Sequence, residues 1–400
     1  MTSGAPPGRR DQRWRGAREV LAAIRREPGI TRAALARRAG LSTGSAAEIV
    51  ARLRGLALVR EGPAPVVGRG RPTTVLAAHP GGPLVLVLDL RHEDWRMALC
   101  GLDGRLQPLA SERHRRRAPR AVLSAIGAAV ARARARWPGR VRAVSVAVSG
   151  TVQGGRIVQA ASLGWGVVDL RPLVGATPLP LLAGNDATLA GVAEARAGAA
   201  RGFRSALHLT VEVGLGGILV VGGDPIGGAT GAGGEFGHMP LGDPRRRCPC
   251  GARGCWDVEV DGRALARHLG ERPPSNARTY GREVLARAAR EPAALRAVEA
   301  TGRVLGAGTA GLVNALDPEV VTLGGLAASM LEVAPRAFSA AYLGGLMSFR
   351  RAAPPEVRRA AFPEDGALRG AAEVGLDAVL AEPQLDGWAR ERTLGARQAP

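Results

Sequence analysis

The spacing of hydrophobic positions changes near residue 80 of this chain. Before that point, apolar residues recur at three- and four-residue intervals in short segments, which indicates amphipathic helices. After it, mostly apolar strand segments at residues 84–89 and 141–148 alternate with helical segments such as residues 120–137. Two further strands are expected within residues 206–221, and one at residues 320–323. Strands that alternate with helices predict an α/β body behind a small helical unit.

The first 80 residues have the pattern of a winged helix-turn-helix. Thr31 and Ser42 are favourable N-caps for two short helices, residues 32–38 and 43 to about 53, and Gly40 permits the tight turn between them. A strand at residues 57–61 and a glycine-rich return at 66–72 predict the wing. The positions expected to pack the helices together are Val20, Leu21, Ile24, Leu35, Ala39, Leu41, Ala46 and Ile49.

Candidate DNA contacts gather on the second helix and on the wing. Hydroxyl side chains at the start of a recognition helix meet base edges or phosphates, and an arginine further along can reach the backbone. Arginines set between glycines at a wing tip can enter a groove or contact phosphate. The residues in these places are Ser42, Thr43, Ser45, Arg52, Arg69 and Arg71. The alternative is an ordinary three-helix bundle with a basic surface.

The charge distribution favours a nucleic-acid partner for this end of the chain. The formal net charge is +20, and residues 1–80 hold 15 Arg against 5 acidic residues. One fifth of the chain therefore carries half of the excess positive charge. This uneven distribution is more informative than the total net charge, which the arginine-rich composition of the whole chain inflates. No apolar run reaches eighteen residues and no secretory signal is recognisable, so we expect a cytoplasmic protein without membrane contact.

Three of the four cysteines fall within eight residues, a clustering that favours a metal site over disulfides in a cytosolic chain. His238, Cys248, Cys250 and Cys255 form the pattern H-x9-C-x-C-x4-C. Three thiolates and one imidazole suit tetrahedral zinc, and four protein ligands leave no open position for catalysis. We expect a structural zinc ion here rather than free cysteines beside an incidental histidine. Cys100 is expected in the core.

Five segments of the body carry recognisable motifs, namely Gly234-Glu235-Phe236-Gly237-His238-Met239, the cysteine loop through Asp257, Ser162-Leu163-Gly164-Trp165, Gly184-Asn185-Asp186-Ala187 and the segment from Val313 to Gly325. Together these motifs resemble the ROK family of sugar kinases, open reading frames and repressors. The resemblance implies a two-lobed actin-like ATPase fold with sugar bound between the lobes. We divide the chain into a winged helix-turn-helix at 1–80, a first lobe at 81–184, and a second lobe with the zinc loop at 185–400, whose last helices can return to the first lobe.

The same resemblance implies the sugar contacts. Asn185 and Asp186 would hydrogen-bond sugar hydroxyls, although this pair can also act as a helix cap. Glu235 would accept from hydroxyls near the anomeric carbon, and His238 would ligate zinc and can also touch the sugar. Asp257 stands where the family usually has glutamate, which is longer by one methylene group.

The phosphate loops of the family's kinases are altered in this chain. Kinases follow the first strand of the body with Asp-x-Gly-Gly-Thr, whereas here it leads into Asp89-Leu90-Arg91-His92-Glu93, whose bulky residues prevent a phosphate nest. In the second loop, Val211-Glu212-Val213-Gly214 puts a carboxylate where anionic phosphates would lie. Asp186 keeps the place of the general base, but a base without a phosphoryl donor transfers nothing. We therefore expect no enzyme activity.

The sequence predicts a transcriptional regulator, a repressor of carbohydrate uptake or catabolism genes. It would bind a palindromic double-stranded operator as a homodimer or homotetramer and respond to a sugar or sugar phosphate in the cleft. Two alternatives stay open. One is an ATP-dependent sugar kinase with an accessory DNA-binding domain, and the other is a constitutive regulator whose sugar site has decayed, as the changes at Ser162 and Asp257 suggest.

Overall fold

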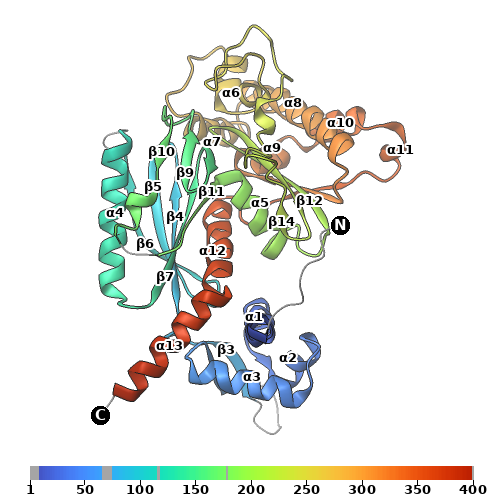
Figure 1. Cartoon of the computed structure of the whole chain (residues 1–400). Helices are drawn as coiled ribbons and strands as arrows, with labels where there is room; N and C mark the ends of the chain where they lie inside the picture. The colour runs from blue at the N-terminus through green and yellow to red at the C-terminus, as the bar shows by residue number, and fades with distance from the viewer. Residues whose placement is uncertain (1–8, 65–73, 115–117, 177–178, 399–400) are drawn as a thin grey trace.

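The computed structural model describes residues 9–64, 74–114, 118–176 and 179–398, and places a small helical unit beneath two α/β lobes (Figure 1). The helical unit contains α1 (Arg9–Arg26), β1 (Ile30–Thr31), α2 (Arg32–Arg38), α3 (Thr43–Gly55), β2 (Val59–Pro63) and β3 (Thr74–Ala78). Among the described residues, the helices lack the length and the apolar character needed to cross a bilayer.

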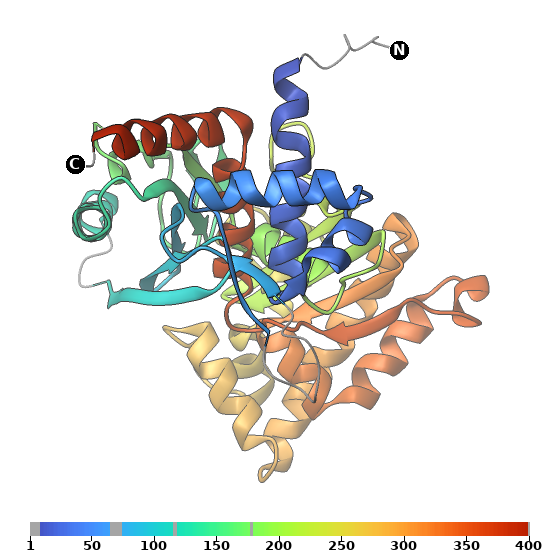
Figure 2. The same cartoon turned by 90° about the horizontal axis from the view of Figure 1, so that it is seen from below.

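The helix-turn-helix forms where the sequence predicts it, with the same two caps. The Thr31 hydroxyl accepts from the Ala34 N–H at 3.2 Å, and the Ser42 hydroxyl accepts from the Ser45 N–H at 3.1 Å. Gly40 adopts a φ of +62° in the turn between the helices. The wing strand starts at Val59, two residues later than expected, because the preceding chain is not extended. Figure 2, the view from below, shows α3 across the front of this unit.

The first lobe contains a mixed sheet in the order β11-β7-β4-β5-β6. Its strands are β4 (Leu84–Leu90), β5 (Asp94–Cys100), β6 (Leu106–Arg113), β7 (Val141–Val148) and β11 (Leu181–Asn185). β4, β7 and β11 are parallel, whereas β4, β5 and β6 form an antiparallel meander. Side chains alternate along β4, so that Leu86 and Leu88 face α4 (Pro119–Arg136), while Val85 and Val87 face α12 (Gly366–Val379).

Edge strand β6 was not predicted from the sequence. The chain remains in this strand through Arg113, and α4 begins at Pro119. β6 is an edge strand with mostly exposed side chains, so its residues lack the apolar alternation by which a strand is recognised. A short sheet of β8 (Thr151–Gln153), β9 (Arg156–Gln159) and β10 (Val168–Asp169) was also not predicted.

The second lobe is built on the sheet β14-β13-β12-β15-β16. Its strands are β12 (Ser205–Glu212), β13 (Gly214–Val221), β14 (Asp224–Pro225), β15 (Val320–Gly324) and β16 (Glu356–Arg359). α5 (Asp186–Ala197) packs on one face of this sheet, and a helical layer packs on the other. That layer contains α6 (Gly262–Leu269), α7 (Ala277–Arg287), α8 (Pro292–Leu316), α9 (Gly325–Val333), α10 (Pro335–Gly345) and α11 (Ser348–Arg351).

α5 and α12 cross between the two sheets at very short range. A Cβ atom at Gly370 of α12 would lie 1.8 Å from the Leu189 carbonyl oxygen of α5, so only glycine permits this crossing. The Glu194 carboxylate of α5 is buried and accepts from the N–H groups of Ala199, Ala361 and Phe362. These contacts fasten the segment before α12 to α5.

The last helix, α13 (Glu382–Gln398), joins the helical unit to the first lobe (Figure 1). Its Trp388 indole donates to the Leu56 carbonyl oxygen at the end of α3, at 2.8 Å, and its Asp386 accepts from the Trp14 indole of α1 at 2.8 Å. On the other side, Glu391 pairs with Arg142 of β7 at 2.8 Å. One continuous apolar core includes residues of α1, α3, β4, α12 and α13.

Replacing Trp388 tests this junction. Trp388→Ala removes a large buried side chain and leaves the Leu56 carbonyl unpaired, so we expect a loss of stability of about 3 to 5 kcal/mol. The measurement is urea denaturation, with limited proteolysis to detect release of the helical unit. Arg390→Ala on the exposed side of the same helix is the control, and equal stability of the two variants would contradict the role of Trp388.

Candidate functional site

Polar side chains from both lobes converge where parallel strands end. β4, β7 and β11 end at neighbouring positions, which brings Asp89, Ser149 and Asp186 to one edge of the first sheet. β12 and β15 of the second lobe are also parallel. Their ends place Glu212 and Gly324 at the edge of the second sheet that faces the first lobe. These residues line one cavity of about 450 Å³. The predicted sugar contacts line it too, namely Asn185, Asp186, Glu235, His238 and Asp257.

Asp186 is the most perturbed carboxyl group of this cavity. Its Oδ2 accepts from the Ser149 hydroxyl at 2.5 Å, and its Oδ1 accepts from the Ala187 N–H at 2.8 Å. Burial, helped by the neighbouring carboxylates of Asp89 and Glu235, raises the pKa of Asp186 to about 6 against the opposing effect of these hydrogen bonds. A group that titrates near neutral pH and accepts from a hydroxyl is well placed to accept from a polyhydroxylated ligand.

Asn185 caps α5, as one of its two expected roles requires. Its Oδ1 accepts from the Thr188 N–H at 3.0 Å, and its Nδ2 donates to the Gly150 carbonyl at 3.1 Å. These two bonds fix the amide plane at the floor of the cavity. Among the described residues, no acceptor contacts the second N–H of this amide.

Glu235 and His238 lie together on the wall of the second lobe. The Glu235 Oε1 accepts from the Thr151 hydroxyl at 2.7 Å, and its Oε2 lies 3.7 Å from the His238 Nε2. The other imidazole nitrogen, Nδ1, lies 3.8 Å from the Cys248 sulfur. His238 therefore presents one nitrogen to the cysteines and the other to the cavity.

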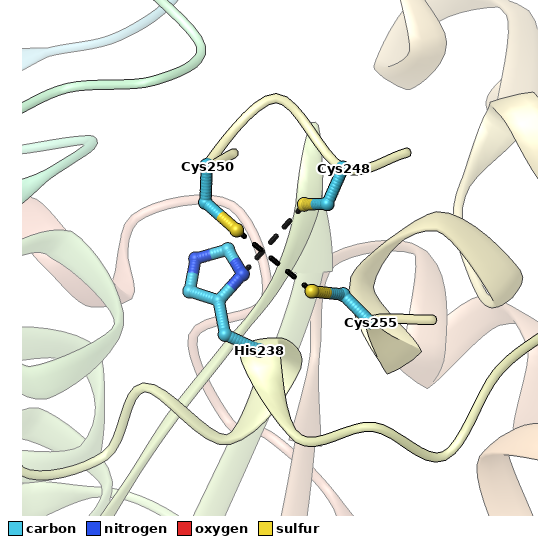
Figure 3. Close-up of side chains that lie close together, drawn as sticks. All are labelled: His238, Cys248, Cys250 and Cys255. Atoms are coloured by element: carbon cyan, nitrogen blue, oxygen red, sulfur yellow. Dashed lines mark hydrogen bonds between the residues drawn. The ribbon is translucent and has the colours of Figure 1, made fainter. Parts of the chain in front are cut away.

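The four predicted metal ligands form one compact cluster (Figure 3). His238 comes from a short 3-10 helix (Phe236–His238), whereas Cys248 and Cys250 come from the following loop and Cys255 precedes a second 3-10 helix (Trp256–Glu259). Their ligand atoms all lie within 4.8 Å of one another. Burial raises the pKa of the Cys248 thiol to about 12 and also raises the pKa of Cys255, so these sulfurs need a cation in order to become thiolates at neutral pH.

The spacing of these atoms fits a tetrahedral ion. Zinc bonds of about 2.3 Å to sulfur and 2.0 Å to nitrogen give edges of roughly 3.8 Å between two sulfurs and 3.6 Å between sulfur and nitrogen. The Cys250 and Cys255 sulfurs are 3.8 Å apart, and the Cys248 sulfur is 3.8 Å from the His238 Nδ1. The cluster could therefore hold a metal ion with little movement. Cys100 lies apart from it, buried in strand β5.

Asp257 is held by the protein itself. Its Oδ1 accepts from the Leu215 N–H at 2.7 Å, and its Oδ2 accepts from Arg263 at 2.9 Å. Arg263 is shared with the buried carboxylate of Asp261 at 2.7 Å. The carboxylate thus lines the cavity while it fixes the β12–β13 turn to the loop that carries the cysteines.

The two altered phosphate loops are filled by ion pairs. In the first, Asp89 is 98% buried and pairs with Arg96 at 2.7 Å, and Arg91 pairs with Asp94 at 2.6 Å. In the second, the Glu212 carboxylate pairs with Arg278 of α7. Burial raises the pKa of Glu212 to about 7, although Arg278 lowers it.

The predicted DNA contacts fall into three groups. Ser42, Thr43 and Ser45 are exposed at the start of α3, with the Ser42 hydroxyl 2.9 Å from that of Ser45. The Arg52 guanidinium lies 5.0 Å from the centre of the Trp14 ring, a cation–π contact that directs it toward α1. Arg69 and Arg71 lie outside the described residues.

Residues 87–377 match the ROK family, and residues 17–54 match winged helix-turn-helix DNA-binding domains. The chain belongs to the ROK family. A glucokinase of Streptomyces coelicolor is 32% identical over 228 residues, which cover 52% of this chain and 71% of the glucokinase. The xylose repressor of Bacillus subtilis is 25% identical over 169 residues, which cover 42% of this chain and 44% of the repressor.

A solved ROK family transcriptional regulator, a homologue of the E. coli MLC protein, has the same fold over most of its length. It aligns with a TM-score of 0.72 at 22% identity, covering 94% of this chain and 100% of that one. The expected fold, a winged helix-turn-helix before a two-lobed ROK body, is confirmed. The chain has the domain combination of a ROK family transcriptional regulator.

Several residues that line the cavity were not predicted from the sequence. Ser149 and Thr151 contact Asp186 and Glu235, and a signal for them was present, because hydroxyl residues directly follow a parallel strand. Arg263 lies six residues beyond Asp257, and no local pattern indicates that it turns back toward this carboxylate.

The raised pKa of Asp186 predicts a pH dependence of stability. An unfolded chain ionises this group near 3.8 and the folded protein near 6, so the wild type loses about 2 kcal/mol of stability as pH rises from 4 to 7. In Asp186→Asn this loss is absent, so its stability relative to the wild type should rise across that range. Urea denaturation at about pH 4 and pH 7 measures the difference.

The matched control is Asp224→Asn, which changes a side chain that is 83% exposed. Its stability relative to the wild type should show no comparable change. If the difference between Asp186→Asn and the wild type is the same at both pH values, the raised pKa is wrong.

Proposed function

We propose that this chain is a DNA-binding repressor of carbohydrate uptake or catabolism genes, controlled by a sugar bound between the lobes of the ROK body. The observation that carries the proposal is the combination of an exposed helix α3 and a polar cavity in one molecule. Helices α12 and α13 connect the cavity to α3. Similarity to the xylose repressor supports it. Control requires that the sugar bind the DNA-competent and DNA-incompetent states with different affinity.

The sugar contacts in this proposal are Asn185, Asp186, Glu235 and His238, with Asp257 as a wall residue. Each carries an oxygen or nitrogen on the cavity surface, and paired donors and acceptors are what hydroxyl groups need. The DNA contacts are Ser42, Thr43 and Ser45, joined by Arg52 and by the wing arginines Arg69 and Arg71. A palindromic operator requires an even number of copies, so we propose a homodimer or homotetramer that acts in the cytoplasm.

We further propose that the cysteine cluster holds structural zinc. Its donor set is that of closed zinc sites, and the distances suit a tetrahedral ion. The ion would fix His238 against Glu235 and would hold the loop that ends at Asp257. The division at residues 80 and 184 remains our proposal for the domains, with α12 returning to the first lobe, where it packs on β4 and β7.

A sugar kinase with an accessory DNA-binding unit is the second candidate, favoured by the similarity to a glucokinase and by the survival of Asp186. Against it stand the two ion pairs that fill the phosphate loops, Asp89 with Arg96 and Glu212 with Arg278. We therefore propose that the chain is not an enzyme.

The operator prediction concerns the start of α3. The double substitution of Thr43→Ala and Ser45→Ala, which spares the Ser42 cap, should weaken binding to the upstream intergenic DNA by about tenfold or more. The measurement is a gel shift at fixed salt, repeated with a panel of sugars. Ser339→Ala, exposed on α10 of the body, is the control.

In the wild type, one sugar of the panel should change the affinity for DNA. Failure to bind DNA would contradict the regulator, and indifference to every sugar would instead favour a constitutive regulator. Turnover of ATP by the same preparation with any sugar would favour the kinase.

The zinc prediction uses the cysteines. The purified wild type should contain about one zinc ion per chain, and Cys250→Ser should lose it. Because the ion would fix His238, the variant should lose its response to sugar before it loses DNA binding. Metal analysis by mass spectrometry and sugar-dependent gel shifts check both points, and Cys100→Ser is the control. A Cys250→Ser protein with full sugar response would overturn this role of the metal.

A further inference from the structure

The cavity between the lobes is acidic, although the protein as a whole is strongly basic. The chain has a formal net charge of +20. Among the described residues that line the cavity, however, eight carry carboxyl groups and five are arginines. Because carboxylates outnumber arginines by three, a ligand in the cavity meets a net negative charge.

The cavity arginines are already neutralised by neighbours. Each arginine in the described lining has a carboxylate partner, which leaves no unpaired guanidinium group there for an anionic ligand. The pairs are Arg91 with Asp94, Arg113 with Glu93, Arg263 with Asp257 and Asp261, Arg278 with Glu212 and Glu364, and Arg282 with Glu364.

Two carboxylates of the floor have no arginine partner among the contacts of the described chain. Asp186 is bound by a hydroxyl and an N–H group, and Glu235 is bound by the Thr151 hydroxyl. Burial raises the pKa of Asp186 to about 6, and the charges of Asp89 and Glu235 act in the same direction. Neighbouring carboxylates therefore already disfavour negative charge on the floor of the cavity, and an anionic ligand would add to this repulsion.

Glu212 occupies the place in the facing lobe that would otherwise attract an anion. The N-terminus of α9, which borders the end of β12 through a backbone bridge between Gly325 and Val211, carries the partial positive charge of a helix start. The Glu212 carboxylate lies against it, since a Cβ at Gly325, the first residue of α9, would be 3.0 Å from the Glu212 Oε1. Arg278, the nearest cation, pairs with the same carboxylate.

We infer that this cavity selects an unphosphorylated sugar, and that Glu212 is the residue that excludes its phosphorylated form. The inference rests on the proposed function and names the class of its effector. A phosphate group near Asp186 would meet the carboxylates of Asp186 and Glu235, which lack an arginine partner among the described contacts, and would find Glu212 already placed against α9 and paired with Arg278. A neutral sugar brings only hydroxyl groups, which these carboxylates bind as acceptors.

Matched pairs of ligands test the selection on the full-length protein. Isothermal titration calorimetry would compare glucose with glucose 6-phosphate, N-acetylglucosamine with its 6-phosphate, and xylose with xylose 5-phosphate. For the sugar that binds, the phosphorylated member should bind roughly 100-fold more weakly. A phosphorylated member that binds as well as the free sugar would overturn the inference and leave sugar control intact.

Variants assign the selection to Glu212. Glu212→Gln should reduce the preference for the free sugar by about tenfold, because one repulsive charge is gone. Glu283→Gln, an exposed position on α7, makes the same chemical change and should keep the wild-type preference. Arg278→Gln removes the partner of Glu212 and should increase the preference, so it tests the same residue if Glu212→Gln does not fold.

The outcomes distinguish a failure of sugar control from a failure of the role assigned to Glu212. If no sugar binds in either form, sugar control fails and the inference fails with it. If the free sugar is preferred but Glu212→Gln and Arg278→Gln both leave the ratio unchanged, the selection does not come from Glu212. Opposite shifts in the two variants would support the assignment.

Discussion

The parallel pairing of β4, β7 and β11 is the constraint on which the cavity depends. Parallel strands end at the same edge of a sheet, so Asp89, Ser149 and Asp186 meet there although they are far apart in the chain. β12 and β15 impose the same arrangement on the second lobe. Short turns follow these strands, and a change of register would move the polar groups out of the cavity or into the core.

The parts of this structure that sequence reasoning predicted are those with local signals. The caps at Thr31 and Ser42 depend on one side chain and the next turn of helix, and the cysteine cluster depends on ligand spacing within a short loop. The strand β7 was predicted at its observed limits because both of its faces are buried, which produces a mostly apolar segment interrupted only by Arg142 and Ser145.

The missed parts depend on contacts between distant segments. β6 is an exposed edge strand without an apolar pattern, and Arg263 reaches Asp257 only because α6 begins beside it. A charged residue at Glu212 could be recognised as incompatible with phosphate from its position in the loop. Its partner Arg278 is 66 residues away in the chain, and no local rule connects the two.

His238 connects the metal cluster with the cavity because its two nitrogens serve different neighbours. If Nδ1 ligates a metal ion, Nε2 must carry the proton, and it then points as a donor toward Glu235, 3.7 Å away. The ion would thereby set the hydrogen-bond polarity of one wall of the cavity without touching a ligand. The same loop carries Asp257, whose bond to the Leu215 N–H fixes the β12–β13 turn. A structural ion at this cluster would therefore affect ligand affinity through the orientation of His238 and the position of Asp257.

A physical path also leads from the cavity to the helix-turn-helix. Asp186 begins α5, and α5 crosses α12 at Gly370 with no room for a side chain, so the two helices have little freedom to slide past each other. α12 leads into α13, whose Trp388 holds the carbonyl of Leu56 at the end of α3. A lobe movement that displaced α5 would therefore act on α12 and, through α13, on the contacts that hold the end of α3. This connection is a physical route by which a ligand that favours one arrangement of the lobes would act on α3.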